Sequence, residues 1–263
     1  MRRNFVHLRK NLSNMLLKSS LESFGRYCLF ICRVFTLPDK WKEFFRRYRD
    51  EIVKLGIDSI PLVIIISIFI GAVCAIQMYL NTSSPLLPKY VVGLTTREII
   101  LLEFSSSILC LILAGKVGSN IASEIGTMRI TEQIDALEIM GVNSANFLVL
   151  PKIAAMVTII SVLVVISMFT SIWGGYMVCA ITGLVPVSVF VYGIQTMFVE
   201  WYVWYALIKS LFFAFVISSV ASYCGYYVRG GALEVGKAST TAVVTSSILI
   251  LLLDVLLTNI MLQ

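Results

Sequence analysis

Apolar residues along this chain are gathered into five long runs separated by shorter polar segments. The runs cover residues 59–80, 98–117, 151–181, 204–226 and 241–262. A helix needs about 20 mostly apolar residues to cross the hydrocarbon core of a bilayer, and each run reaches that length. Backbone polar groups in lipid must be satisfied within their own segment, so each run is expected to be helical. The pattern predicts an all-α polytopic membrane protein with five transmembrane helices.

The third run is longer than one crossing requires. It contains Gly174 and Gly175, which predict a tilt or a kink. It also begins at Pro151, and proline suits the first turn of a helix because its missing N–H has no partner there. We therefore expect Pro151 in the first turn of the third helix.

A helical repeat of apolar positions precedes the first run. Its apolar members recur at steps of three and four residues: Leu17, Leu21, Phe24, Cys28, Ile31 and Phe35. Three basic residues lie among them: Lys18, Arg26 and Arg33. The repeat predicts an amphipathic helix, followed by a turn in the sequence TLPDK at 36–40. Such a helix can lie in the membrane interface or pack on the bundle or a partner, and the spacing leaves both open. We assign 1–54 to a basic interfacial region and 55–263 to the five-helix domain.

The stretch SEIGTMRITEQIDALEIMGV, between the second and third runs, interrupts the apolar pattern. Gly126 can loosen the helix that leaves the membrane. Thr127 or Thr131 can cap a new helix, and Gly141 can end it. These signals predict a separate short helix over about residues 127–140.

This predicted helix is amphipathic. One face is apolar and contains Ile130, Ile134, Leu137 and Gly141. The other face is acidic and contains Glu132, Asp135 and Glu138. A helix of this length can neither span a bilayer nor hold together alone in water, so it must dock. It can rest on the protein's own helices with its acids in water, or it can also present a face to a soluble partner. The spacing alone leaves these alternatives open.

Small residues recur at every fourth position just before this helix. They form the stripe Ala114, Gly118, Ala122 and Gly126, beside a second stripe that begins at Gly115. Small residues at this spacing let membrane helices approach backbone to backbone, so close packing is expected here. The sequence AGKVGS is not a Walker A loop, because its glycine spacing is wrong and valine follows the lysine.

Composition and charge agree with a membrane protein and suggest its orientation. Charged residues make up 14% of the chain, against about a quarter in soluble domains. Residues 1–54 hold thirteen of the 21 Lys and Arg. Basic residues also follow the second and fourth runs, so the positive-inside rule predicts a cytoplasmic N-terminus and a periplasmic C-terminus. The basic block is better explained by a membrane surface than by nucleic acid.

The chain shows little of the chemistry that metal sites or secretory signals require. It has one histidine, His7, and six scattered cysteines without a CxxC pair. This composition argues against a metal site, and we expect no cofactor. The N-terminus lacks the pattern of a cleaved signal peptide.

Three ionisable residues fall inside predicted spans. Glu103, Lys209 and Asp254 lie at similar depth, about 7–12 Å from the predicted outer ends at the rise of an α-helix. A lone charge at such depth is costly, so these residues are expected to pair or to face water. We expect Lys209 to neutralise Asp254 or Glu103 beside an outward-opening cavity, although a purely structural ion pair would show the same pattern.

The segment AGKVGSNIASEIGTMRITEQIDALEIMGVNSANFLVLPKIAA (114–155) resembles the signature region of the MlaE permease family. A second segment, GKASTTAVVTSSILILLLDVLLTNIM (236–261), resembles the last helix of that family. The family's Arg-Glu-Leu-Gly-Pro run is replaced here by LEFSS at 102–106, which keeps the glutamate and lacks the arginine. Arg97 and Glu98 lie five residues earlier and are candidates to compensate.

The resemblance implies a permease subunit of an ABC transporter that moves phospholipids between the inner and outer membranes. It implies a homodimer in the inner membrane, a cytoplasmic ABC ATPase, a periplasmic MCE-domain protein and a STAS-type accessory protein that reaches the complex through the ATPase. It also implies that the short helix is a coupling helix seated on the ATPase. The residues expected to make that contact are Glu124, Arg129, Glu132, Asp135, Glu138 and Met140.

Two other classes of function are compatible with the pattern. A stand-alone channel or ion-coupled secondary transporter would use the buried acids as ion sites, but it leaves the short acidic helix unexplained. An intramembrane enzyme would need a base beside a nucleophile, and the single histidine lies outside every predicted span. We therefore expect a transport subunit without a catalytic site of its own.

Overall fold

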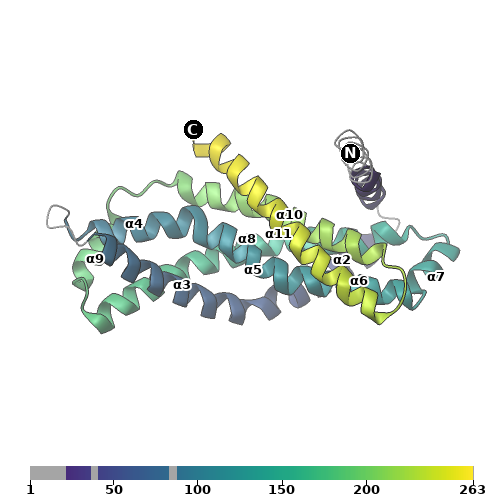
Figure 1. The fold of residues 1–263 in the computed structure, drawn as a ribbon, viewed down its shortest axis with the longest axis horizontal. Helices are drawn as coiled ribbons and strands as arrows, with labels where there is room; N and C mark the ends of the chain where they lie inside the picture. Colours follow the sequence, from purple (N-terminus) through teal and green to yellow (C-terminus); the bar gives the residue numbers. More distant parts are fainter. Residues whose placement is uncertain (1–21, 37–40, 83–87, 263) are drawn as a thin grey trace, which may run out of the picture.

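The regular elements of the chain are all helices in the computed structural model, which describes residues 22–36, 41–82 and 88–262 (Figure 1). In chain order they are a helix over residues 22–34, α2 (Trp41–Glu51), η1 (Ile52–Gly56), η2 (Ile57–Ser59), α3 (Ile60–Asn81), α4 (Val91–Ile99), η3 (Ile100–Ile108), α5 (Leu109–Leu113), η4 (Ala114–Gly118), α6 (Ser119–Ile130), α7 (Gln133–Ile139), α8 (Ser144–Thr182), α9 (Val187–Gln195), α10 (Trp201–Tyr226) and α11 (Ala232–Leu262). The segments η1, η3 and η4 are π-helical, and η2 is a 3₁₀ turn.

Five continuous helical runs of the described chain are long and apolar enough to cross a membrane. They are Trp41–Asn81, Val91–Ile130, Ser144–Thr182, Trp201–Tyr226 and Ala232–Leu262. The predicted all-α polytopic architecture is therefore confirmed. Each helical run is longer than the apolar stretch that predicted it.

The helices form an elongated bundle, in which α3, α8 and α10 run along the long axis and α11 crosses them obliquely (Figure 1). The short helix α7 lies at one end of the bundle and α9 at the other. We call these the α7 end and the α9 end. A large core joins α3, α5, α6, α8 and α10, and a smaller apolar cluster joins α9 to its neighbours.

Two glycines bring α3 and α8 into backbone contact. A Cβ atom on Gly71 would lie 1.8 Å from the Ser171 carbonyl oxygen, and one on Gly174 would lie 2.2 Å from the Ile68 carbonyl oxygen. The Ser67 and Ser167 hydroxyls are hydrogen-bonded across the same contact at 2.8 Å. Gly174 therefore allows two helices to approach closely. From the sequence, a kink or a tilt was expected at Gly174, and this role was not predicted.

Replacing Gly71 with alanine is expected to destabilise the bundle. The added methyl group would meet backbone, which cannot move aside as a side chain can, and overpacking of this kind costs about 1–3 kcal/mol or more. The measurement is the thermal unfolding midpoint of the detergent-solubilised protein. Gly115→Ala is the control, because nothing lies within 4 Å of a Cβ built at Gly115. Equal midpoints for the two variants would contradict the proposed contact.

The predicted small-residue stripe lies mostly inside the bundle. Ala114, Gly118, Ala122 and Gly126 are buried. The Ala122 carbonyl oxygen lies 2.6 Å from a Cβ built at Gly225 of α10, and a Cβ on Gly126 would lie 3.1 Å from Val235 of α11. Gly115 is not brought into such a contact.

The third transmembrane helix begins earlier than predicted. Its first residue is Ser144, and the Asn143 side chain caps it by accepting a hydrogen bond from the Asn146 N–H at 3.3 Å. Pro151 therefore lies inside α8, and its expected place in the first turn is wrong. The polar cap at Asn143 adds two turns that hydropathy alone does not reveal.

The helix over residues 22–34 packs on α10 through a face that the apolar repeat did not identify. Phe30 and Val34 are buried, and the Tyr27 and Ser219 hydroxyls are hydrogen-bonded at 2.7 Å. Phe24, Cys28 and Phe35 of the predicted stripe are exposed, and Ile31 is half-buried against the core. One face thus rests on the bundle while an apolar face stays uncovered. Leu17, Lys18, Leu21 and residues 37–40 of the predicted turn lie outside the described residues, as does His7.

Candidate functional site

The α7 end carries the segment that the sequence singled out, but as two helices. The second membrane run continues without interruption through Gly126 and ends at Ile130, and α7 covers only Gln133–Ile139. The expected loosening at Gly126 and the expected single helix over 127–140 therefore differ from the structure. Glu132 makes the turn between the two helices with a φ of 60°.

Gly141 ends α7, as its sequence position predicted. Its φ is +77°, in the left-handed region where glycine pays no steric cost. The Gly141 N–H donates to the Glu138 carbonyl at 3.0 Å, and the Val142 N–H donates to the Leu137 carbonyl at 3.1 Å. These bonds form a Schellman motif that closes the helix.

One face of α7 is fixed on the bundle. Ile134 is fully buried, and Leu137 packs against the core. The Glu138 carboxylate accepts hydrogen bonds from the Tyr226 hydroxyl at 2.8 Å and the Ser144 hydroxyl at 2.9 Å. Asp135 pairs with Arg129 at 2.7 Å. Three of the predicted contact residues, Arg129, Asp135 and Glu138, are thus engaged within the chain.

The opposite face of α7 is uncovered and partly apolar. Ile139 is 87% exposed and Met140 is 68% exposed. Glu132, at the start of the helix, is exposed as well. A helix held rigidly on one side with bare apolar residues on the other has the form of a docking element. Sequence reasoning missed Ile139, although its place next to Met140 was the available signal.

Glu124, another predicted contact residue, belongs to an ion-pair network. Its carboxylate lies 2.6 Å from the Lys54 ammonium and 3.0 Å from that of Lys152, which also pairs with Glu51. Lys152 is buried, so its charge needs these partners. The network joins the first, second and third membrane runs beside α7. Two of its members, Lys54 and Glu124, line a hollow of about 550 Å³ that extends to Gln133 at the start of α7.

The hydrogen bonds to Glu138 predict a pH dependence for the docking of α7. Tyr226, and then Ser144, donate to the carboxylate and hold the pKa of Glu138 below its ordinary value. A group with a lowered folded-state pKa stabilises the fold at pH above its unfolded pKa, and this contribution is lost as pH falls through the folded pKa. We expect the difference in unfolding midpoint between the wild type and Glu138→Gln to shrink as pH falls below the ordinary carboxyl range. A difference that stays constant from pH 7 to pH 3.5 would contradict this interpretation.

Nearer the α9 end, the structure brings the three intramembrane charges together. The Lys209 ammonium contacts Asp254 and lies 3.2 Å from both Glu103 oxygens. Lys209 is fully buried, and the Ser107 hydroxyl lies within hydrogen-bond distance of Asp254 at 2.8 Å and of Glu103 at 3.1 Å. Tyr205 adds a hydroxyl 3.0 Å from Lys209. The cluster is a buried cation shared by two acids, with serine and tyrosine completing its hydrogen bonds.

One hollow adjoins this cluster, and a second is lined by Phe104, the residue that follows Glu103. The first, of about 600 Å³, is lined by Glu103 and Asp254 together with apolar and polar residues near the C-terminal end of α11. The other, of about 240 Å³, is almost wholly apolar and lies between α3 and η3, with Phe69, Val73 and Phe104 among its lining residues. Charged and apolar concave surfaces therefore lie close together, since Glu103 and Phe104 are neighbours in η3. Pairs of this kind suit an amphiphile.

Arg97 does not join the charge cluster. Its guanidinium is 1% exposed and donates to the carbonyl oxygens of Ile194 at 2.7 Å, Thr196 at 2.8 Å and Met197 at 3.1 Å. It therefore fixes the end of α9 and the turn after it, and it does not stand in for the family's missing arginine beside Glu103. Sequence reasoning did not identify α9, because its nine residues are too few to give a membrane signal.

No group of three or more His, Cys, Asp or Glu side chains with metal-binding geometry occurs within residues 22–36, 41–82 and 88–262.

Comparison with known proteins agrees with this architecture. The family model described as Permease MlaE matches residues 48–260. A protein of Rickettsia bellii named "Probable ABC transporter permease protein" is 34% identical over 257 residues, covering 95% of this chain and 97% of its own length. A protein of the same type from Synechocystis is 30% identical over 223 residues, covering 83% and 82%, and one from Pyropia yezoensis is 31% identical over 219 residues, covering 81% of each chain. The chain therefore belongs to the MlaE family of ABC transporter permeases.

Proposed function

We propose that this multi-pass permease moves phospholipids across the cell envelope and is driven by a separate cytoplasmic ABC ATPase. The observation that carries the proposal is α7, a helix fixed on one face by the bundle and bare on the other. An ATPase can move the membrane helices only through an element that contacts both the ATPase and the bundle. The Glu138 hydrogen bonds and the buried Ile134 attach α7 to the bundle, and Ile139 and Met140 form its free face.

The proposed orientation places the α7 end in the cytoplasm and the α9 end in the periplasm of an inner-membrane protein. Basic residues concentrate near the α7 end, as the positive-inside rule requires, and they include Lys54, Arg129, Lys152, Arg229 and Lys237. The ATPase would then meet α7, and a STAS-type protein would reach the complex through the ATPase. A periplasmic MCE-domain protein would meet the α9 end.

The hollows near the α9 end support a phospholipid as cargo. The apolar hollow between α3 and η3 suits an acyl chain, and the hollow beside Glu103 and Asp254 suits a polar headgroup. The outward face of α11 is largely apolar and uncovered, with Val244, Leu251 and Val255 exposed. We propose that two copies of the chain meet there, so that lipid is held between them.

The mechanism requires no catalysis by this chain. Closure of the ATPase dimer would draw the two α7 helices together. The rigid contacts of α7 would pass this movement to α6, α8 and α10, because Tyr226 of α10 and Ser144 of α8 both donate to Glu138. Two bundle conformations with different affinity for lipid are sufficient for transport.

The test is lipid transfer by the permease reconstituted with its ATPase and MCE partners in vesicles containing fluorescent phospholipid. We expect ATP-dependent transfer that stops when the ATPase carries an inactivated Walker motif. Transfer that continues without ATP hydrolysis would favour a stand-alone channel or ion-coupled transporter. Retention of the ATPase without any lipid movement would keep the ABC assignment and reject the phospholipid cargo.

A further inference from the structure

The segment that joins α7 to α8 also holds the end of the helix that precedes α2. The Asn146 side-chain amide donates to the carbonyl oxygens of Val34 at 2.8 Å and Thr36 at 2.6 Å. The Asn143 side-chain amide donates to the Arg33 carbonyl oxygen and to the Thr36 hydroxyl, both at 3.1 Å. We call these four hydrogen bonds the asparagine clamp. The clamp joins segments that lie 107–112 residues apart in the sequence.

The clamp supplies partners that the end of a helix requires. The last carbonyl groups of a helix have no N–H partner within the helix, so side chains or water must donate to them. Asn146 is 8% exposed, so its bonds are made away from water, where an unpaired polar group is costly. The Asn143 side-chain oxygen meanwhile accepts from the Asn146 N–H and caps α8. The same two residues therefore begin α8 and end the helix over residues 22–34.

The clamp lies next to the contact that fixes α7. Ser144, between the two asparagines, donates to the Glu138 carboxylate at 2.9 Å. The two contacts are one residue apart, since Asn143 directly precedes Ser144, the first residue of α8. Consecutive residues thus hold α7 on one side and the helix over residues 22–34 on the other. A displacement of α7 should therefore displace that helix as well.

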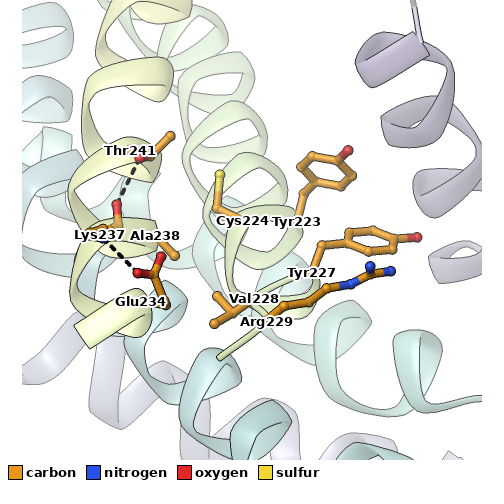
Figure 2. A pocket seen from close by; sticks show the side chains of 9 residues that line it. All are labelled: Tyr223, Cys224, Tyr227, Val228, Arg229, Glu234, Lys237, Ala238 and Thr241. Carbon is orange, nitrogen blue, oxygen red and sulfur yellow. Dashed lines mark hydrogen bonds and ion pairs between the residues drawn. The ribbon is translucent and has the colours of Figure 1, made fainter. Parts of the chain in front are cut away.

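This helix in turn packs on the end of α10. The Phe30 ring lies among the rings of three tyrosines, with centroids 5.1–5.8 Å away: Tyr223, Tyr226 and Tyr227. Figure 2 shows Tyr223 and Tyr227 projecting away from α11, and Phe30 meets them there. Tyr226 also donates to the Glu138 carboxylate at 2.8 Å. Phe30 therefore touches a side chain that already joins α7 to α10.

We propose that Asn143 and Asn146 are positioning residues that make the helix over residues 22–34 part of the element moved by the ATPase. This inference rests on the role proposed for α7. Movement of α7 would reach α10 by two routes, through the hydrogen bonds of α7 itself and through the clamped helix. Without the clamp, the free face of α7 still binds the ATPase, but each ATP hydrolysed moves less lipid.

The first test follows hydrogen exchange in the purified permease with and without its ATPase. In the wild type, we expect the ATPase to slow amide exchange both in α7 and at residues 30–36. In Asn143→Asp with Asn146→Leu, exchange in α7 should still slow, whereas residues 30–36 should no longer respond. Aspartate keeps the cap of α8 and leucine keeps the branched shape, but neither an ionised carboxylate nor leucine can donate to a carbonyl group.

The basal exchange rate gives a measure of the clamp that does not depend on the ATPase. Because one net hydrogen bond shifts an equilibrium by about fivefold, loss of the clamp should raise exchange at residues 30–36 by roughly tenfold or more. The matched control is Asn120→Leu, which replaces an exposed asparagine of α6 whose side chain makes no hydrogen bond among the described residues. This control should exchange as the wild type does.

The exchange data separate the clamp from the role of α7. If the ATPase slows exchange in α7 of the wild type but not at residues 30–36, the clamp does not transmit movement and the inference is wrong, while the role of α7 stands. If the ATPase slows exchange in neither segment, the role proposed for α7 is wrong and this inference fails with it.

The second test measures the lipid transferred for each ATP hydrolysed by the reconstituted transporter. This ratio should fall several-fold in Asn143→Asp with Asn146→Leu, while co-purification of the ATPase is unchanged. An unchanged ratio would overturn the positioning role, because a helix that is only loosened changes exchange without changing the ratio. If the wild type hydrolyses ATP without moving lipid, the proposed cargo is wrong, and the response of residues 30–36 to the ATPase decides the inference.

A cross-link provides a rescue that a general loss of stability would not show. Thr36→Cys with Asn143→Cys places a thiol on each side of the clamp, at residues whose side-chain polar atoms lie 3.1 Å apart. The exposed Cys28 and Cys32 are replaced by serine so that they do not compete. With the thiols free, lipid transfer per ATP should be low, and a short bifunctional thiol reagent should restore it. Transfer that stays low after cross-linking would show that the helix must separate from α8, and the inference would be wrong.

Discussion

Ile139→Asp is expected to abolish co-purification of the ATPase while the permease itself remains folded. Ile139 is 87% exposed on a helix whose other face is fixed, so the substitution does not disturb the core. In the complex, the same side chain would be buried in a cleft of the ATPase. A central apolar contact of this kind contributes about 2 kcal/mol or more, which corresponds to about a thirtyfold loss of affinity. The measurement is a pull-down of the ATPase with tagged permease, followed by titration of the purified subunits.

Leu233→Asp is the matched control for this experiment. Leu233 is 74% exposed and lies at the same end of the bundle, but outside α7. It should leave ATPase binding unchanged. Met140→Asp should weaken binding as Ile139→Asp does. If the ATPase is retained by both α7 variants, another surface makes the contact and the role proposed for α7 is wrong.

The predicted acidic contact residues are divided by the structure into two groups. Glu132 remains exposed, so Glu132→Lys tests the outer face of α7 directly. Glu138 and Asp135 make bonds within the chain, and a charge reversal at either would loosen α7 as well as alter its surface. If those variants lose ATPase binding, the cause could be either a lost contact with the ATPase or the loosening of α7 from the bundle. The same loss in Ile139→Asp would show a lost contact, because Ile139 does not hold α7 on the bundle.

Lys209→Met is expected to cause the largest loss of stability in the membrane bundle. The substitution leaves Asp254 and Glu103 facing each other without the cation that both contact. Removing one partner of a buried ion pair costs about 3–5 kcal/mol, because the remaining charge is uncompensated. The thermal unfolding midpoint in detergent should fall by many degrees, or the protein should fail to assemble.

The double variant Lys209→Met with Asp254→Asn distinguishes charge from packing. It removes the uncompensated buried acid, while Glu103, which is partly exposed, can turn toward the adjoining hollow. Its midpoint should recover much of the loss. Lys89→Met, at an exposed lysine, serves as the control and should be neutral. A double variant no more stable than Lys209→Met would show that the charges are not coupled.

The sequence pattern predicted those features of the fold that are set by the residues of one continuous segment. Each apolar run became a helix because a bilayer offers the backbone no other partner, and Gly141 ended α7 because few other residues tolerate its φ. The extent of the helices was harder to predict. Ser144 begins α8 because Asn143 caps it, and a local polar cap leaves no mark on a hydropathy profile.

The candidate sites could be predicted where a residue type by itself signals that it needs a partner. Lys209 was expected to pair with Asp254 or Glu103, because charges at similar depth need partners, and in the structure it contacts both. The serine and tyrosine that complete the cluster were not expected, since Ser107 and Tyr205 are ordinary residues until the helices are placed. For Arg97 likewise, only the fold shows that its donors reach carbonyl groups about one hundred residues away.

By itself, the sequence determined that this chain is a membrane protein with five transmembrane helices and a short amphipathic helix between the second and the third. These properties follow from the hydrophobicity and spacing of consecutive residues. Only the tertiary structure decided which face of α7 is free, because Ile134 and Ile139 are equally apolar and differ only in what lies opposite them. It likewise decided that Glu124 and Glu138 hold the bundle together, because the partners of a charge are set by helices that are distant in sequence and adjacent in space.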